Sequence, residues 1–194
     1  MRSMVYFRCW ILFLPFSIGL SQEVLIVYFS THGHTAAMAD AVAQGVRSVS
    51  GVTAKVLSVD QAKVNDALSA DAIILGSPVY NANVAPPIQD FINSWPFEGQ
   101  KFQDKIGAAF VTGGGISAGE ELVQLNILHS MLIFRMIIVG GPNWEQAFGA
   151  SAITGETPFN HEAGEEIVHP DFLAKGEALG RRVAVLSNRL NPAR

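Results

Sequence analysis

An apolar run that stops abruptly at a hydroxyl-rich turn limits what this chain can fold into more than any other feature. Residues 24–29 read Val-Leu-Ile-Val-Tyr-Phe, without alternation of apolar and polar positions. Such a run is typical of a strand that is buried on both faces. The Ala- and Met-rich segment from Thr35 onward has helical spacing. The sequence therefore predicts a strand, a turn over residues 30–34 and a helix.

This turn is a candidate phosphate site. The start of a helix presents unpaired backbone N–H groups and the positive end of its dipole, and Ser30, Thr31 and Thr35 add hydroxyl groups. Because the turn has no lysine and lacks the Gly-Lys-Ser or Gly-Lys-Thr ending of a nucleoside triphosphate loop, a single phosphate is the better expectation. His32 and His34 are expected to contribute backbone N–H groups. An ordinary turn with N-capping hydroxyls is the alternative.

Length and composition indicate one compact domain. The chain has 194 residues, of which 49% are hydrophobic and 15% are charged. The formal net charge is -4 and no basic run exceeds the pair at 181–182, so the electrostatic footprint of a nucleic-acid-binding protein is missing. The single cysteine, Cys9, excludes an internal disulfide and a metal site built from cysteines. Small molecules or other proteins are the expected partners, and no metal is expected.

Strand and helix signals alternate along the chain. Strands are expected at residues 24–29, 52–59, 72–76, 106–111 and 136–139. Helices are expected at residues 35–49, partly at 60–68, from Pro86 or Pro87 to Trp95, at 119–134 and from about 165 to 190. Residues 143–164 show no clear periodicity and are expected to form a functional loop. The pattern predicts an α/β fold, a doubly wound parallel sheet of five strands with helices on both faces.

Ligands of such sheets bind beyond the carboxyl ends of the strands. Three segments fall at this edge of the predicted sheet, residues 30–35, 77–85 and 112–118, and all three are rich in residues that let the backbone approach a ligand. Neither Ser77 nor Ser117 lies in the strained turn that would present a nucleophile. The three loops are therefore the expected ligand site, and no side chain is expected to act as a nucleophile.

Three motifs carry a family resemblance. They are Val-Leu-Ile-Val-Tyr-Phe-Ser-x-x-Gly-His-Thr at 24–35, Asp-Ala-Ile-Ile-Leu-Gly-Ser-Pro at 71–78 followed by Tyr80 and Asn83, and Phe-Val-Thr-Gly-Gly-Gly at 110–115 followed by Glu120. In this order and separation they resemble the flavodoxin-like NAD(P)H:quinone oxidoreductases of the WrbA type. The resemblance covers nearly everything from Val24 to the last helix. It implies the flavodoxin-like strand order 2-1-3-4-5 and an FMN-binding domain at residues 23–194.

The resemblance assigns each loop to one part of the flavin mononucleotide. The phosphate is expected to be wrapped by Ser30, Thr31, His32, Gly33, His34 and Thr35. The isoalloxazine ring is expected to lie along Pro78, Val79, Tyr80, Asn81 and Asn83, with Tyr80 packing on its face. The dimethylbenzene side or the ribityl chain is expected to meet Thr112, Gly113, Gly114 and Gly115.

The chain also departs from the family pattern. Where the family usually has a histidine pair that reaches the ring from a neighbouring subunit, this chain has Phe134 and Arg135. Residues 116–118, Ile-Ser-Ala, replace a more glycine-rich run. A homo-oligomer, either a dimer or a tetramer, is implied by the resemblance, but a proton-donating role at residues 134–135 is in doubt.

The implied activity is that of an FMN-dependent oxidoreductase. NADPH or NADH would deliver a hydride to the flavin, and a small-molecule quinone would then accept two electrons. Because the flavin carries the chemistry, no catalytic side chain is expected. A flavodoxin-type carrier that passes single electrons to protein partners is the alternative, and an accessory protein with little turnover is a third possibility.

The first 22 residues differ from the rest of the chain. Residues 9–20 are almost wholly apolar, and residues 19–21 resemble a small-x-small cleavage site. A secretory signal, a short membrane anchor and an extension that reflects an uncertain start codon are the three interpretations. The anchor ranks last, because the run is brief against the about 20 apolar residues of a spanning helix and contains Pro15.

The location of the cofactors favours the extension over the signal. A chain exported unfolded would have to find flavin and reduced nicotinamide outside the cytoplasm, and the adjacent arginine pair of the folded-export signal is absent from this segment. We therefore expect a cytoplasmic protein without stable membrane association. If residues 1–21 are a cleaved signal peptide, the protein is exported.

Overall fold

The computed structural model of the protein describes residues 21–160 and 167–190. The expectations for the apolar segment at residues 1–20, Cys9 included, lie outside the described residues. The first strand begins at Gln22, whose side chain is buried. None of the described helices combines the length and the apolar character that crossing a membrane requires.

Strands and helices alternate as the sequence predicts. The strands are β1 (Gln22–Tyr28), β2 (Val52–Ser58), β3 (Ala72–Tyr80), β4 (Asn83–Val84), β5 (Ile106–Gly113), β6 (Ile137–Ile138) and β7 (Ala150–Ile153). The helices are α1 (His34–Arg47), α2 (Val64–Ser69), α3 (Pro86–Asn93), α4 (Glu120–Ile133) and α5 (Pro170–Leu190), with 3-10 turns at Glu98–Gln100 and Trp144–Gln146. Helix α5 begins later than the expected start near residue 165. The sheet order β2-β1-β3-β5-β6 confirms the predicted order 2-1-3-4-5 for the five predicted strands.

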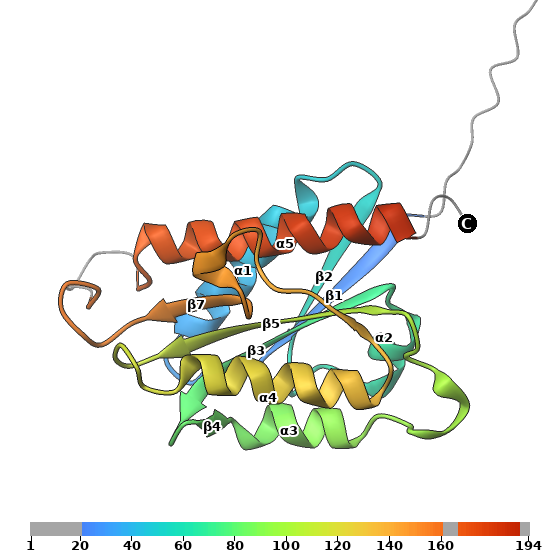
Figure 1. The fold of residues 1–194 in the computed structure, drawn as a ribbon, viewed down its shortest axis with the longest axis horizontal. Coiled ribbons are helices and arrows are strands. Elements are labelled where there is room, and N and C mark those ends of the chain that lie inside the picture. Colours follow the sequence, from blue (N-terminus) through green and yellow to red (C-terminus); the bar gives the residue numbers. More distant parts are fainter. Residues whose placement is uncertain (1–20, 161–166, 191–194) are drawn as a thin grey trace, which may run out of the picture.

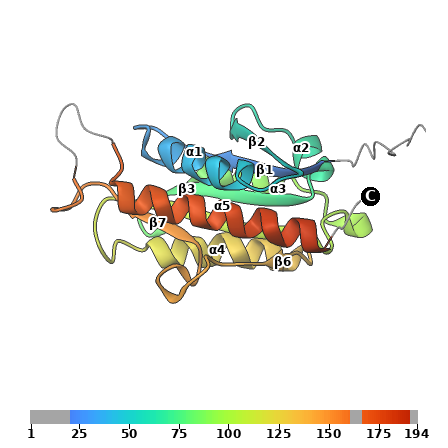
Figure 2. The same cartoon turned by 90° about the horizontal axis from the view of Figure 1, so that it is seen from above.

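Helices cover both faces of the sheet, which explains the apolar run in β1. Figure 1 shows α1 and α5 on one face and α3 and α4 on the other, and α5 lies beside α1 in Figure 2 as well. Val24 and Ile26 pack in the core under α1 and α5. Leu25 and Val27 pack in the core under α3 and α4. All four side chains are fully buried, so neither face of β1 has room for a polar residue.

The sheet has seven strands, so the prediction of five was wrong in number. Strand β7 lies in the segment 143–164 that was expected to be a loop. Because β6 pairs only with Ile106 and Gly107 at the start of β5, the rest of that edge of β5 is open, and β7 pairs with it in parallel at Phe110–Gly113. The outer position of the sheet is thus shared by two short strands.

Strand β3 also extends beyond its expected end at Gly76. Its pairing with β1 stops at Gly76, so Ser77 and Pro78 pair with β5 alone, and Val79 and Tyr80 then pair with β4. Pro78 is tolerated there because an edge position does not need its missing N–H. Asn81 and Ala82 then form a two-residue turn with φ of 51° and 58°, which returns the chain as the antiparallel strand β4. The segment 77–85 is therefore a small hairpin rather than an open loop.

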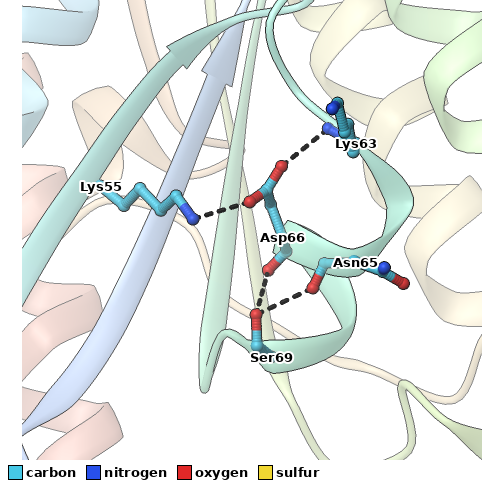
Figure 3. A network of polar contacts seen from close by, with 5 residues as sticks. All are labelled: Lys55, Lys63, Asn65, Asp66 and Ser69. Carbon is cyan, nitrogen blue, oxygen red and sulfur yellow. Dashed lines mark hydrogen bonds and ion pairs between the residues drawn. The ribbon is translucent and has the colours of Figure 1, made fainter.

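A polar network joins β2 to the short helix α2 (Figure 3). The Lys55 ammonium lies 2.6 Å from Asp66 Oδ1, and the other carboxylate oxygen accepts the Lys63 N–H at 2.8 Å. The Ser69 hydroxyl donates to the carbonyl oxygens of Asn65 and Asp66 at the helix end. The hydrogen bond from Lys55, followed by that from the Lys63 backbone, lowers the pKa of Asp66 below its ordinary value. The same contact raises the pKa of Lys55.

Candidate functional site

The structure brings the three predicted loops together at the carboxyl edge of the sheet. We name them the first loop (residues 29–33), the second loop (residues 78–83) and the third loop (residues 113–119). The Thr31 hydroxyl lies 2.8 Å from the Tyr80 hydroxyl, which joins the first loop to the second. A Cβ atom added to Gly113 would lie 3.7 Å from Val79 Cγ2, so the third loop is in van der Waals reach of the second.

Gly33 shapes the first loop. It has φ of 90° and ψ of -20° and directly precedes α1, a left-handed conformation that residues with a Cβ avoid. Its N–H donates to the Ser30 hydroxyl at 3.1 Å, and its carbonyl accepts the Ala37 N–H at 2.9 Å. A Cβ atom at this position would lie 2.9 Å from Ile167 Cδ1. No side chain caps α1, so the positive end of the helix faces this tight loop.

The two threonines predicted to touch the cofactor are buried and bound to each other. The hydroxyl groups of Thr35 and Thr112 are 2.8 Å apart, and the residues are 1% and 5% exposed. Their side chains therefore fasten the start of α1 to the end of β5, behind the open face of the site. Ser30, Thr31 and His32 lie at the surface of the first loop, and the His32 ring is 6.5 Å from that of His34.

Tyr80 holds the second loop against the first. Its ring meets Phe29 edge to face at 6.2 Å, and its hydroxyl is shared with Thr31. Within the loop, the Asn83 amide donates to the Asn81 carbonyl at 2.9 Å, which stabilises the tight turn. Tyr80 remains 39% exposed at the rim of the site, so its ring keeps a free surface on which a flat ligand can pack.

The third loop depends on residues that sequence reasoning missed. The Thr154 N–H donates to the Gly113 carbonyl at 2.9 Å, and Glu156 Oε2 accepts the Ile116 N–H at 2.6 Å. Glu120 Oε1 accepts the Ser117 N–H at 3.2 Å. Thr154 and Glu156 follow β7, and no motif around them in the sequence indicates a role, because their partners lie about forty positions earlier.

The Phe134–Arg135 departure has a structural explanation. The Phe134 ring lies 5.3 Å from Trp95 and 5.5 Å from Phe102, inside an aromatic cluster below α3 and α4. Arg135 has φ of 65° and ends the turn after α4. Phe134 therefore contributes to the packing of its own chain, where the family pattern has a side chain that reaches a neighbour.

A cavity of about 650 Å³ lies elsewhere, between α1 and α5. Its walls are mostly apolar, with Asp40, Gln44 and Glu177 as the polar groups. No described residue of the three loops lines this cavity. We place the candidate site at the loops because hydroxyl and N–H donors gather there.

The residues at the three loops fit FMN. A glycine in a left-handed conformation, hydroxyl groups and an uncapped helix start together suit a phosphate held without a lysine. The rim position of Tyr80 suits a flat ring, and glycines in the third loop leave space for close approach. Among the described residues, no group of three or more His, Cys, Asp or Glu side chains could hold a metal ion.

Comparisons with known proteins agree with this geometry. Residues 60–149 match the family described as NADPH-dependent FMN reductase. A protein of Azorhizobium caulinodans named NAD(P)H dehydrogenase (quinone) is 31% identical over 162 residues, which cover 71% of this chain and 80% of that protein. A flavodoxin of Aquifex aeolicus is 30% identical over 172 residues, which cover 84% of this chain and 85% of the flavodoxin.

A solved structure repeats the fold. The flavodoxin, WrbA-like protein from Agrobacterium tumefaciens superposes with a TM-score of 0.71 over 87% of this chain and 99% of that chain, at 22% identity. This likeness shows the fold, whereas the identity to the curated relatives over most of their lengths shows the family. The chain therefore belongs to the family of the NAD(P)H dehydrogenase (quinone) proteins and has a flavodoxin-like fold.

Proposed function

We propose that this protein binds FMN at the three loops and transfers electrons from NADPH or NADH to a quinone. The observation that carries the proposal is the convergence of the three loops around an uncapped helix start led by Gly33. The names of the relatives, NAD(P)H dehydrogenase (quinone), supply the substrate class. FMN, when bound, accepts a hydride from the nicotinamide and gives two electrons to the quinone.

The residues of the chain have to bind FMN and orient it. The first loop would hold the phosphate with backbone N–H groups and the hydroxyls of Ser30 and Thr31. The second loop would lie along the ring, with Tyr80 at its face. The glycines of the third loop would let the backbone approach the ribityl chain or the dimethylbenzene side. We assign no side chain as a nucleophile or as a general acid or base.

Reduction by each nicotinamide under anaerobic conditions tests the proposal. FMN-loaded protein is mixed with NADPH or with NADH, and the flavin absorbance in the visible range is followed. We expect the absorbance to bleach with at least one nicotinamide and to return when a benzoquinone is added. Flavin-loaded protein that neither nicotinamide reduces would refute the enzyme.

A flavodoxin-type electron carrier is the second candidate, and the 30% sequence identity to a flavodoxin of Aquifex aeolicus favours it. Carriers dock their protein partners through dense charge, and a formal net charge of -4 over 194 residues is modest. A carrier would take electrons from a reduced protein partner and not from NADPH or NADH. The anaerobic experiment therefore separates the two candidates.

A homo-oligomer, a dimer or a tetramer, is part of the proposal. Helix α4 exposes three large apolar side chains on its outer side, with Leu122 56%, Leu132 47% and Ile133 62% exposed. Large apolar side chains that are exposed together on one helix mark an interaction surface, and we assign a second copy of this chain as the cover. Sedimentation should give more than one subunit, and Ile133→Glu should reduce the mass while Gln44→Glu on α1 leaves it unchanged. A wild-type protein that sediments as one subunit would contradict this assignment.

The proposed location is the cytoplasm, where reduced nicotinamide is supplied. Mass spectrometry of the protein from its native host reads its first residue directly. An N-terminus at Gln22 would indicate export and overturn this part of the proposal.

A further inference from the structure

The third loop is held from outside by the segment that follows β7. Both the N–H and the hydroxyl of Thr154 donate to the Gly113 carbonyl, at 2.9 Å and 3.2 Å. Two residues later, Glu156 Oε2 accepts the Ile116 N–H at 2.6 Å. A hydrogen bond to a carboxylate is about twice as strong as one between neutral groups. Of the two carboxylates that hold this exposed loop, Glu156 makes the shorter contact, because Glu120 Oε1 accepts the Ser117 N–H at 3.2 Å.

The ties on the loop determine which N–H groups it presents. The Ile116 N–H is taken by Glu156, the Ser117 N–H by Glu120 and the Ala118 N–H by the Gly115 carbonyl. Within residues 21–160 and 167–190, no acceptor takes the N–H of Gly114 or of Gly115. The loop therefore offers two adjacent glycine N–H groups at the edge where the other two loops converge.

We infer that Glu156 is a positioning residue of the cofactor site, and that its carboxylate holds the third loop so that the N–H groups of Gly114 and Gly115 face FMN. This inference rests on the proposed function and deepens it. A loop that is ordered before binding does not have to lose conformational freedom when the cofactor arrives, so the affinity rises. Glu156 acts through the loop and touches no reacting atom.

Gly115 supports the same assignment from the opposite side. A Cβ atom added there would lie 2.9 Å from Glu156 Oε2, so only glycine leaves room for the carboxylate at this distance. The φ of Gly115 lies outside the left-handed region, so alanine is compatible with the backbone. Gly115→Ala would therefore push the carboxylate away without straining the chain, which gives an independent means of breaking the contact.

The first experiment replaces the acceptor in the full chain. Glu156→Leu removes it, and Glu156→Gln keeps a neutral oxygen that can still accept the Ile116 N–H. We expect the Ile116 amide to exchange with solvent fastest in Glu156→Leu and at an intermediate rate in Glu156→Gln. The dissociation constant for FMN, measured by quenching of flavin fluorescence, should rise about tenfold in Glu156→Leu and less in Glu156→Gln, as expected for the loss of a charge-assisted hydrogen bond.

Glu121→Leu is the matched control. Glu121 is an exposed glutamate in the first turn of α4, close to the third loop in sequence, and no described residue bonds to it. This variant should change neither the exchange of the Ile116 amide nor the affinity for FMN. If Glu156→Leu behaves like Glu121→Leu in both measurements, the inference is overturned.

The second experiment combines the two routes. If Gly115→Ala acts by displacing the Glu156 carboxylate, the double variant with Glu156→Leu binds FMN no more weakly than either single variant. If the two substitutions instead lower the affinity for FMN additively, Gly115→Ala does not act by displacing the Glu156 carboxylate. Failure of the proposed function looks different, because a wild-type protein that does not bind FMN leaves the protection of the Ile116 amide measurable in the protein alone.

Discussion

At the scale of the residue, the site depends on one glycine in a backbone conformation that residues with a Cβ rarely adopt. Gly33 combines a left-handed φ of 90° with a Cβ direction that points at Ile167. Its position just before a helix is visible in the sequence, and so is the absence of lysine from the loop. Its contact with Ile167 is not visible, because that residue follows a long segment without periodicity.

Gly33→Ala should weaken FMN binding by at least about tenfold and destabilise the fold by about 1–2 kcal/mol, the cost of a left-handed conformation for a residue with a Cβ. Gly51→Ala is the matched control. Gly51 has φ of 78°, lies in the turn between α1 and β2, and has nothing within 4 Å of its added Cβ. It should lose similar stability and keep its affinity. Equal FMN affinity in the two variants would contradict the role of the first loop.

The buried pair of threonines gives a second prediction at this scale. Thr35→Val leaves the Thr112 hydroxyl buried without its partner, which should cost about 1–3 kcal/mol in urea unfolding. The double variant with Thr112→Val removes both hydroxyls at nearly constant volume and should recover most of that loss. A double variant that is as unstable as the sum of the two single variants would show that the hydroxyls stabilise the fold independently.

The Thr35–Thr112 pair also shows what the sequence could not provide. Both residues lie at the carboxyl edge of the sheet, which the sequence predicts because each follows a predicted strand. That their hydroxyls bond to each other depends on how the start of α1 meets the end of β5, which brings together residues 77 positions apart. The contact of Glu156 could not be predicted from the sequence for the same reason, because it depends on the pairing of β7 with β5.

At the scale of the element, the closest packing is between α1 and α5. A Cβ atom on Gly180 would lie 2.0 Å from the Val42 carbonyl oxygen, and one on Gly45 would lie 1.9 Å from the Glu177 carbonyl oxygen. Backbone therefore meets backbone where the two helices cross. This contact fixes α1, the helix that follows the first loop, against α5.

Two glycines of α5 provide a matched pair of variants. Gly180→Ala forces the helices apart and should lower stability by about 1–2 kcal/mol, because overpacking outweighs the better helix propensity of alanine. Gly176→Ala would bring its Cβ to 3.2 Å from Ala41 Cβ, a milder approach than at Gly180, so it should lower stability by less than Gly180→Ala or leave it unchanged. Thermal unfolding of both variants measures the difference, and equal unfolding midpoints would contradict the close crossing.

The contact between β2 and α2 predicts a dependence on pH. The pKa of Asp66 is lowered in the folded state, so the unfolded chain binds more protons and the contribution of Asp66 is present above its ordinary value of 3.8. That contribution is lost as the pH falls through the lowered pKa. The stability difference between wild type and Asp66→Asn should shrink in this acid range. Asp90→Asn, at an exposed site without a described ion pair, should show no such trend, and a constant difference for Asp66→Asn would contradict the ion pair.

The sequence predicts which strands and helices are present better than it predicts where each one ends. The five buried or half-buried strands have apolar runs that identify them, and their order follows from the flavodoxin-like resemblance. Strand β7, Ala-Ser-Ala-Ile, has only one β-branched residue and four positions, so its sequence carries almost no strand signal. Strand β3 runs through Pro78, a residue that normally ends a strand, because that part of β3 has a neighbour on one side only.

At the scale of the whole molecule, a layer of helices on each face of the sheet supports the sheet, and three loops lie together at its carboxyl edge. The first loop brings the positive end of α1, the second brings Tyr80 and the third brings two glycine N–H groups. None of these groups is a cation, although the proposed ligand carries a phosphate. We therefore expect the phosphate to be bound by backbone N–H and hydroxyl donors alone.

The affinity of the full chain for FMN, compared with its affinity for riboflavin, tests this central claim most directly. Riboflavin has the same ring and ribityl chain but lacks the phosphate. If the first loop holds the phosphate through several charge-assisted hydrogen bonds, FMN should bind at least about a hundredfold more tightly than riboflavin. Equal dissociation constants for the two flavins would contradict the account.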